Sequence, residues 1–106
     1  MYIHVDTSAV PPIARLTDRD NFRAFAIVVD GTNDRLPAVA DALADLGVVD
    51  PDGEHAMLDA AAVHRLAGAS TGDAWSAEFD NMVEYARSKG WTDDHGRVRA
   101  HLEWRT

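Results

Sequence analysis

The last ten residues hold the side chains best suited to acid–base chemistry. His101 lies two residues from both Arg99 and Glu103, and residues at i and i+2 of a strand share one face. An imidazole between a carboxylate and a guanidinium can exchange protons beside a bound anion. We therefore take His101 and Glu103 as candidate catalytic residues and Arg99 as a candidate ligand-binding residue. The alternative is a solvated or dimer-facing strand with ordinary charge pairs.

Two further residues could reach the same surface from other strands. Arg23 stands in the apolar run before residue 30, and His55 begins a second short apolar segment. Both are added to the candidate ligand-binding set with Arg99.

The sequence predicts no metal site and no cofactor. It has five histidines and no cysteine, and no two histidines have the spacing of a known zinc-binding motif. The acidic stretch Asp50-Pro51-Asp52-Gly53-Glu54 lacks the regular ligand spacing of an EF-hand loop. Its Pro-Asp-Gly order is typical of a turn. We interpret it as the turn of a hairpin.

The charge of the chain argues against nucleic-acid binding. The formal net charge is −8, and residues 41–59 carry six acidic residues with no Lys or Arg. Phosphate backbones repel such a surface. A regulator or nucleic-acid mimic remains as a minor alternative. No apolar run approaches the roughly 20 residues needed to cross a bilayer, so no membrane contact and a cytoplasmic location are expected.

Periodicity predicts three helices, near residues 35–46, 59–67 and 73–89. Leu36, Val39, Leu43 and Leu46 recur at helical spacing, and Asp59 is a suitable N-cap for the second helix. The third helix carries an apolar stripe of Trp75, Phe79, Met82, Val83 and Ala86.

Four strands are expected, near residues 22–30, 48–50, 54–58 and 97–105. Val98, Ala100, Leu102 and Trp104 alternate with polar residues in the last of these. Residues 1–21 are interpreted as an N-terminal arm that leads into a single domain of residues 22–106, because Pro11-Pro12 interrupts any strand that Ile3 and Val5 begin.

This order of elements predicts an α+β domain. It corresponds to a ferredoxin-like β-α-β-β-α-β sandwich with an extra short helix, in which an antiparallel sheet has its helices on one face. The expected core consists of Phe22 or Phe25 together with Ile27, Val28, Leu36, Val39, Leu43, Leu46, Trp75, Phe79, Met82, Val83, Leu102 and Trp104.

The run from Phe22 to Val29 is apolar at both odd and even positions. Read as one strand, it needs cover on both faces, and the chain's own helices cover only one of them. A second copy packed on the open sheet face would supply the rest. The sequence therefore predicts a homodimer or a higher homo-oligomer.

Two functions follow from these patterns. The first is a small acidic accessory or interaction protein, with no catalytic activity, that homo-oligomerises through its open sheet face and has a possible protein partner. The second is a small dimeric α+β-barrel enzyme or ligand-binding protein that uses His101, Arg99 and Glu103. A filled, dry sheet face favours the first, and a cavity of about 300 Å³ or more favours the second.

Overall fold

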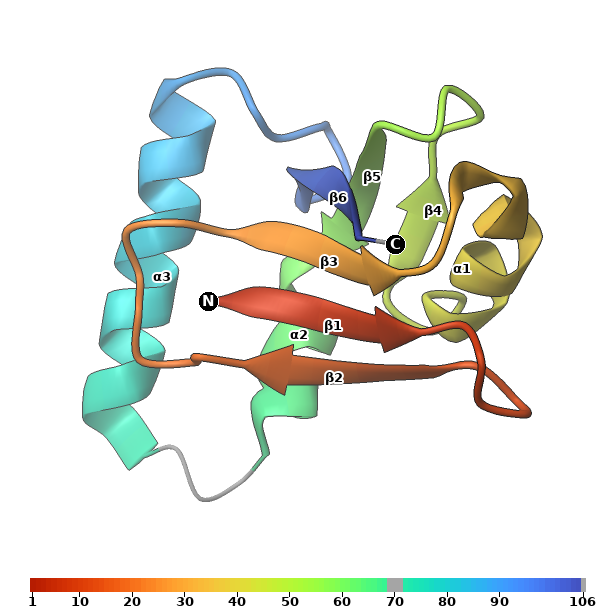
Figure 1. Cartoon of the computed structure of the whole chain (residues 1–106). Coiled ribbons are helices and arrows are strands. Elements are labelled where there is room, and N and C mark those ends of the chain that lie inside the picture. The colour runs from red at the N-terminus through yellow and green to blue at the C-terminus, as the bar shows by residue number, and fades with distance from the viewer. Residues whose placement is uncertain (69–71, 106) are drawn as a thin grey trace.

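The chain folds as one curled sheet with its helices packed on one side. The computed structural model describes residues 1–68 and 72–105. Within them the helical segments are η1 (Asn33–Arg35), α1 (Leu36–Ala42), α2 (Ala60–Ala67) and α3 (Gly72–Ser88). The six strands lie in the spatial order β2 (Ile13–Thr17), β1 (Tyr2–Asp6), β3 (Ala26–Asp30), β6 (Arg97–Arg105), β5 (His55–Asp59) and β4 (Gly47–Val49) (Figure 1).

The sheet is mixed. β1 runs parallel to β3 and β3 parallel to β6, whereas β2, β5 and β4 join antiparallel to their neighbours. The antiparallel sheet predicted from the sequence is therefore wrong, and the ferredoxin-like arrangement is not confirmed. The α+β class holds, as does the short helix after Asp59, whose side chain accepts a hydrogen bond from the Ala61 N–H at 3.0 Å.

The main departure from prediction is at the N-terminus. Residues 1–21, expected as an arm, supply the hairpin β1–β2, and β1 lies in the interior of the sheet between β2 and β3. Ile3 and Val5 are completely buried. The double proline lies in the connection between β1 and β2, where a strand is not required.

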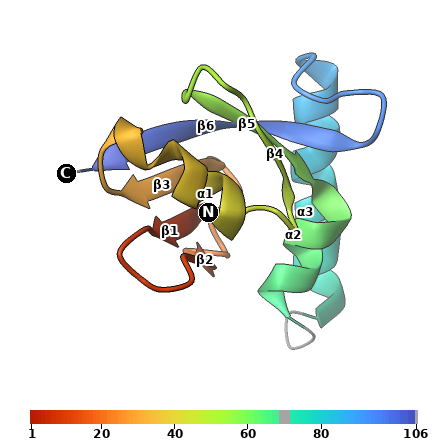
Figure 2. The same cartoon turned by 90° about the vertical axis from the view of Figure 1, so that its right-hand side faces the viewer.

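The core lies between the sheet and all three α-helices. Ile3, Ile27 and Leu102 face it from three neighbouring strands, and the helices contribute Val39, Val63 and Phe79 among others. Figure 2 shows α2 and α3 beside each other against the sheet. Most of the predicted core is buried or half-buried in this layer, and the half-buried members that pack against it are Phe22, Phe25, Met82, Val83 and Trp104.

The apolar run before Asp30 is not one long strand. β3 begins only at Ala26, and Phe22 and Phe25 lie in the preceding loop and pack against the helix-side core. On the opposite, open face, β3 presents Ala26 and Val28. Val28 is only 4% exposed within the single chain, because β1 and β6 flank it on both sides. The run therefore does not by itself require a second copy as cover.

Candidate functional site

The predicted site residues of β6 share the open face of the sheet. His101, Arg99 and Glu103 alternate with the buried Ala100 and Leu102 and are exposed. Glu103 forms an ion pair with Arg105 at 3.6 Å. The strand pattern thus positions these side chains as expected, on a surface that solvent reaches.

The sheet brings His55 next to His101. The two residues are direct partners in the antiparallel pairing of β5 with β6, and their ring centroids lie 5.5 Å apart in an edge-to-face arrangement. Leu102 N–H donates to the Glu54 carbonyl at 2.8 Å, so His55 and His101 occupy the adjacent non-hydrogen-bonded pair. Such pairs hold their side chains closest together.

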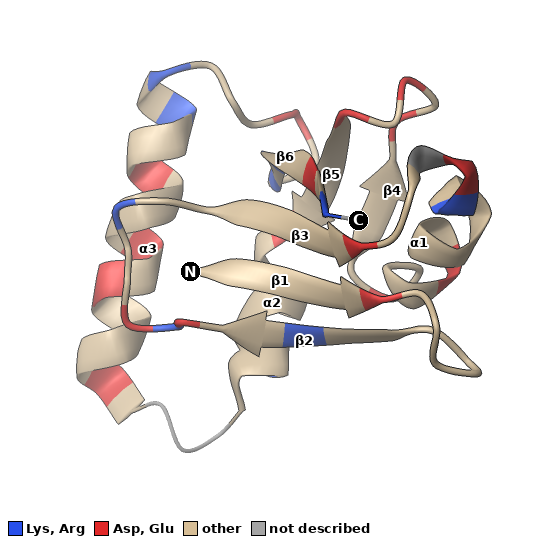
Figure 3. Cartoon of the chain, in the orientation of Figure 1, with Lys and Arg blue, Asp and Glu red and all other residues tan. Residues whose placement is uncertain are grey.

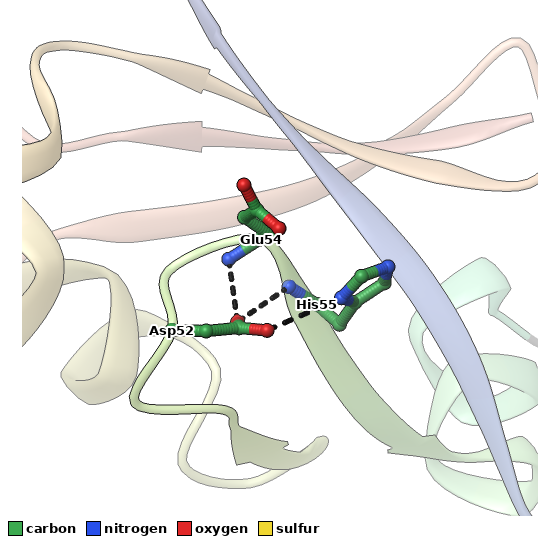
Figure 4. Close-up of side chains that lie close together, drawn as sticks. All are labelled: Asp52, Glu54 and His55. Atoms are coloured by element: carbon green, nitrogen blue, oxygen red, sulfur yellow. Dashed lines mark hydrogen bonds and ion pairs between the residues drawn. The ribbon is translucent and has the colours of Figure 1, made fainter.

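An acidic turn adjoins this histidine pair. Asp52 accepts hydrogen bonds from the backbone N–H groups of Glu54 at 2.7 Å and His55 at 3.3 Å, and its second oxygen lies 3.5 Å from His55 Nδ1 (Figure 4). The N–H of Glu54 is the main cause that lowers the pKa of Asp52, and His55 adds to it. Asp52 is therefore an ionised carboxylate beside an imidazole.

The turn is also anchored from the core. Trp104 Nε1–H donates to the carbonyl of Gly53 at 2.8 Å, and Gly53 adopts a φ of 73°, which favours glycine. The hairpin predicted at the Pro-Asp-Gly sequence is confirmed, and its position is fixed relative to β6.

A third histidine, His4, lies on the open face and was not predicted as a site residue. His4 Nε2 lies 2.6 Å from Asp30 Oδ2, across the parallel pair β1 and β3. No local pattern joins residues 4 and 30, and only the pairing of the two strands does. Beside His4, a small hollow of about 80 Å³ is lined by Asp6, Ile13 and Arg15.

Arg23 does not join His101. It lies in the loop before β3 and lines a narrow groove of about 100 Å³ together with Arg99. The largest apolar side chains of this groove are those of Phe22, Phe25, Met82, Tyr85 and Trp91. Tyr85 is 58% exposed and Trp91 40% exposed, and their rings meet edge to face at 6.0 Å. We call this surface the aromatic groove.

The aromatic groove widens toward the N-terminal half of α3. There a hollow of about 470 Å³ shares Phe22, Arg23 and Tyr85 with it and adds Asp20 and Glu78. At the other end lies Arg99, and Lys89 Nζ sits 5.5 Å from the Tyr85 ring centroid. Figure 3 shows acidic positions along α3 and basic positions at its C-terminal end. The groove thus has one acidic and one basic end.

A serine–histidine contact joins α2 and α3. Ser76 Oγ–H donates to the Gly72 carbonyl at 3.1 Å, and His64 Nε2 lies 2.8 Å from the same oxygen. His64 also packs edge to face on Trp75 and Phe79. We interpret the contact as part of the packing between α2 and α3.

Asp93 organises the turn that starts β6. Desolvation raises its pKa, but the N–H groups of Arg97 and His95 and the Arg97 guanidinium outweigh that effect, so the pKa lies below the usual 3.8. Arg97 Nε donates to Asp93 Oδ2 at 2.7 Å. A carboxylate whose pKa is lower in the folded state than in the unfolded state stabilises the fold at a pH above its unfolded-state pKa. This contribution to the free energy of unfolding is lost as the pH falls through the folded-state pKa.

We therefore expect Asp93→Asn to flatten the loss of stability below about pH 4. Urea midpoints measured across this acid range test the expectation. Asp94→Asn is the control, because it removes the same charge from the same turn but none of these hydrogen bonds. If the urea midpoints of wild type and Asp93→Asn fall equally as the pH is lowered, the Asp93 carboxylate contributes nothing to the pH dependence of stability.

Comparisons with known proteins do not place the chain in a family. No protein-family model matches the chain, and searches of curated proteins and of solved structures each found no match. Within the described part of the chain, no helix has both the length and the apolarity that crossing a membrane requires.

Proposed function

We propose that this chain is a small interaction protein, not an enzyme, and that it homo-oligomerises through the aromatic groove. The supporting observation is the exposure of Tyr85 and Trp91 over a groove floored by Phe22, Phe25 and Met82. Contiguous exposed aromatic surface marks binding sites, and tyrosine, tryptophan and arginine dominate the energies of protein interfaces. Arg23 and Arg99 border these rings.

The open sheet face is less suited to this role than the sequence predicts. Its exposed side chains on β6 are Arg99, His101, Glu103 and Arg105, and the apolar residues of its central strands, such as Ala26 and Val28, are half-buried or buried within the chain. Exposed apolar side chains stand only toward its outer strands, at Ile13 and Val48. Permanent dimer interfaces are more apolar at their centres than this face is.

A second copy of the chain fits the charges of the aromatic groove. Asp20 and Glu78 stand at one end of it and Arg99 at the other. A two-fold axis through the middle of the groove sets the acidic end of one copy against the basic end of its partner, with the aromatic side chains between them. Two-fold dimers need this kind of self-complementary surface.

The expected result is a dimer with about twice the 11.6 kDa mass of the chain, measured by light scattering. Tyr85→Ser should raise the dimer dissociation constant at least tenfold, about 1.4 kcal/mol, because it removes a central ring. Val48→Ser is the matched control, since Val48 is equally exposed but lies on the open sheet face. A monomer at micromolar concentration contradicts the proposal, and a dimer weakened only by Val48→Ser moves the interface to the sheet.

A charge exchange tests the orientation of the two copies. Glu78→Arg and Arg99→Glu should each weaken the dimer, because each places like charges opposite one another. The double variant should recover most of the lost affinity. Single variants that each dimerise as wild type would contradict the two-fold arrangement, and so would a double variant weaker than both.

One observation favours ligand binding as a second function, in which His101 would contact the ligand. The sheet places His55 beside His101 and an ionised Asp52 beside His55. The acid–base enzyme predicted as the alternative has less support. Arg23 lies apart in the aromatic groove, and the hollow beside His4 holds about 80 Å³, whereas small-molecule pockets hold about 300 Å³ or more.

A further inference from the structure

The hairpin of β4 and β5 and the neighbouring strand β6 bring together donor groups that bind transition metals. We propose that His55, His101 and Asp52 form a binding site for a divalent transition-metal ion such as Zn²⁺, with Glu54 as a further carboxylate ligand. These four residues lie outside the aromatic groove, and Arg99 is a neighbour of both surfaces.

The two imidazoles are held by strand pairing. His55 and His101 occupy a non-hydrogen-bonded cross-strand position, and their ring centroids are 5.5 Å apart. Nitrogen ligands bind zinc at about 2.0–2.1 Å, so two of them on one ion lie about 3.4 Å apart. His101 is exposed, and the proposed site requires its side chain to turn so that a ring nitrogen faces the same ion as His55.

The acidic turn supplies the oxygen ligands. Asp52, Glu54 and His55 each place a ligand atom within 4.8 Å of the others. Figure 4 shows the Asp52 carboxylate directed toward the His55 ring. Hydrogen bonds from two backbone N–H groups hold Asp52 in this orientation, and the contact of Trp104 with Gly53 holds the turn. Ligands fixed by such outer contacts bind metals more tightly.

The donor set selects the class of metal. Two imidazoles with one or two carboxylates are typical of zinc and neighbouring transition ions, whereas calcium and magnesium require sites made almost entirely of oxygen ligands. No metal site was predicted from the sequence because residues 55 and 101 are far apart in the chain and match no motif. The register of β5 with β6 makes them neighbours.

The surrounding charge favours a cation. Asp50 stands in the same turn, and Glu103 lies two residues from His101 on the same face. Two arginines lie on the same face: Arg105 pairs with Glu103 at 3.6 Å, and Arg99 lies two residues from His101 on the other side. Arg99→Gln is therefore expected to tighten metal binding, which is opposite to its effect on a site that binds anions.

Isothermal titration of the full chain with zinc chloride tests the site. We expect one ion per chain with a dissociation constant below about 100 µM, and at least tenfold weaker binding for His55→Gln and for His101→Gln. His95→Gln is the control, because His95 is an exposed histidine in another turn. A wild-type dissociation constant above about 100 µM overturns the proposal. So does a His101→Gln variant that binds zinc as tightly as wild type, or a His95→Gln variant that loses as much zinc affinity as His101→Gln.

Cobalt provides a readout of the ligands and their geometry. Co²⁺ bound to two imidazoles and a carboxylate in a tetrahedral site absorbs strongly in the visible range, and this band should be lost in His101→Gln and reduced in Asp52→Asn. Circular dichroism of the metal-free variants confirms that each is folded. An unchanged cobalt spectrum in His101→Gln would contradict the role of that residue. Because Tyr85→Ser leaves all four ligands in place, it should bind zinc as wild type does.

Discussion

Replacing Phe79 with alanine is expected to lower the free energy of unfolding by about 3–5 kcal/mol. Phe79 is 3% exposed and stacks on the Trp75 ring at 5.1 Å with an angle of 11° between the rings. The His64 ring contacts both of these rings edge to face, at 5.7 Å from Phe79 and 5.4 Å from Trp75. Removing the ring therefore leaves a cavity at the contact of α2, α3 and the sheet. Because a domain of this size has a total stability of roughly 5–15 kcal/mol, much of it is lost.

Urea denaturation followed by circular dichroism measures this change. Glu84→Ala is the control on the same helix, since Glu84 is 61% exposed and pairs only with Arg87 at 3.2 Å. That variant should stay within about 0.5 kcal/mol of wild type. A midpoint for Phe79→Ala equal to that of Glu84→Ala would mean that the apolar stripe of α3 does not pack against this sheet.

Deleting residues 1–21 is expected to abolish folding. These residues form β1 and β2, and β1 pairs with β3 along its whole length. The deletion removes the completely buried Ile3 and Val5 from the core and exposes an edge of the parallel strand β3. Parallel strands are rarely stable without cover and neighbours. A segment that served only as an arm would leave the rest of the chain folded.

The dispersion of amide signals in a two-dimensional NMR spectrum distinguishes the two outcomes. Within the full chain, Ile3→Ala should cost about 2–5 kcal/mol, because its side chain is buried between the sheet and the helices. Val10→Ser is the matched control, since Val10 is 97% exposed in the connection between β1 and β2. A well-dispersed spectrum for residues 22–106 would restore the division into arm and domain.

Local patterns predicted the helices and the later strands well. The apolar residues of α3 recur at helical spacing, and those of β6 alternate as in a strand, so each pattern fits only one kind of element. Asp59 marks the start of α2 because its side chain caps the first turn. α1 ends at Ala42, before the predicted residue 46, because the chain turns from Leu43 to bring Gly47 into β4.

The errors arose where two explanations fit one pattern. The apolar run from Phe22 to Val29 combines a loop whose aromatic rings fold onto the helix layer with a strand that starts at Ala26. Composition does not separate these, because both bury apolar surface. In the same way, a short strand before a double proline resembles an arm unless its partner strand is known.

The sequence by itself determined the α+β class, the three helices, the Pro-Asp-Gly hairpin and the exposed alternation of His101 with its neighbours, since each depends on contacts within a few residues. The tertiary structure decided the strand order, the burial of Ile3 and Val5, and the juxtapositions of His55 with His101 and of His4 with Asp30. These depend on which strands pair and in which register. Strand pairing joins residues distant in the chain through backbone hydrogen bonds, which are common to all residues, so a local side-chain pattern does not identify the partner strand.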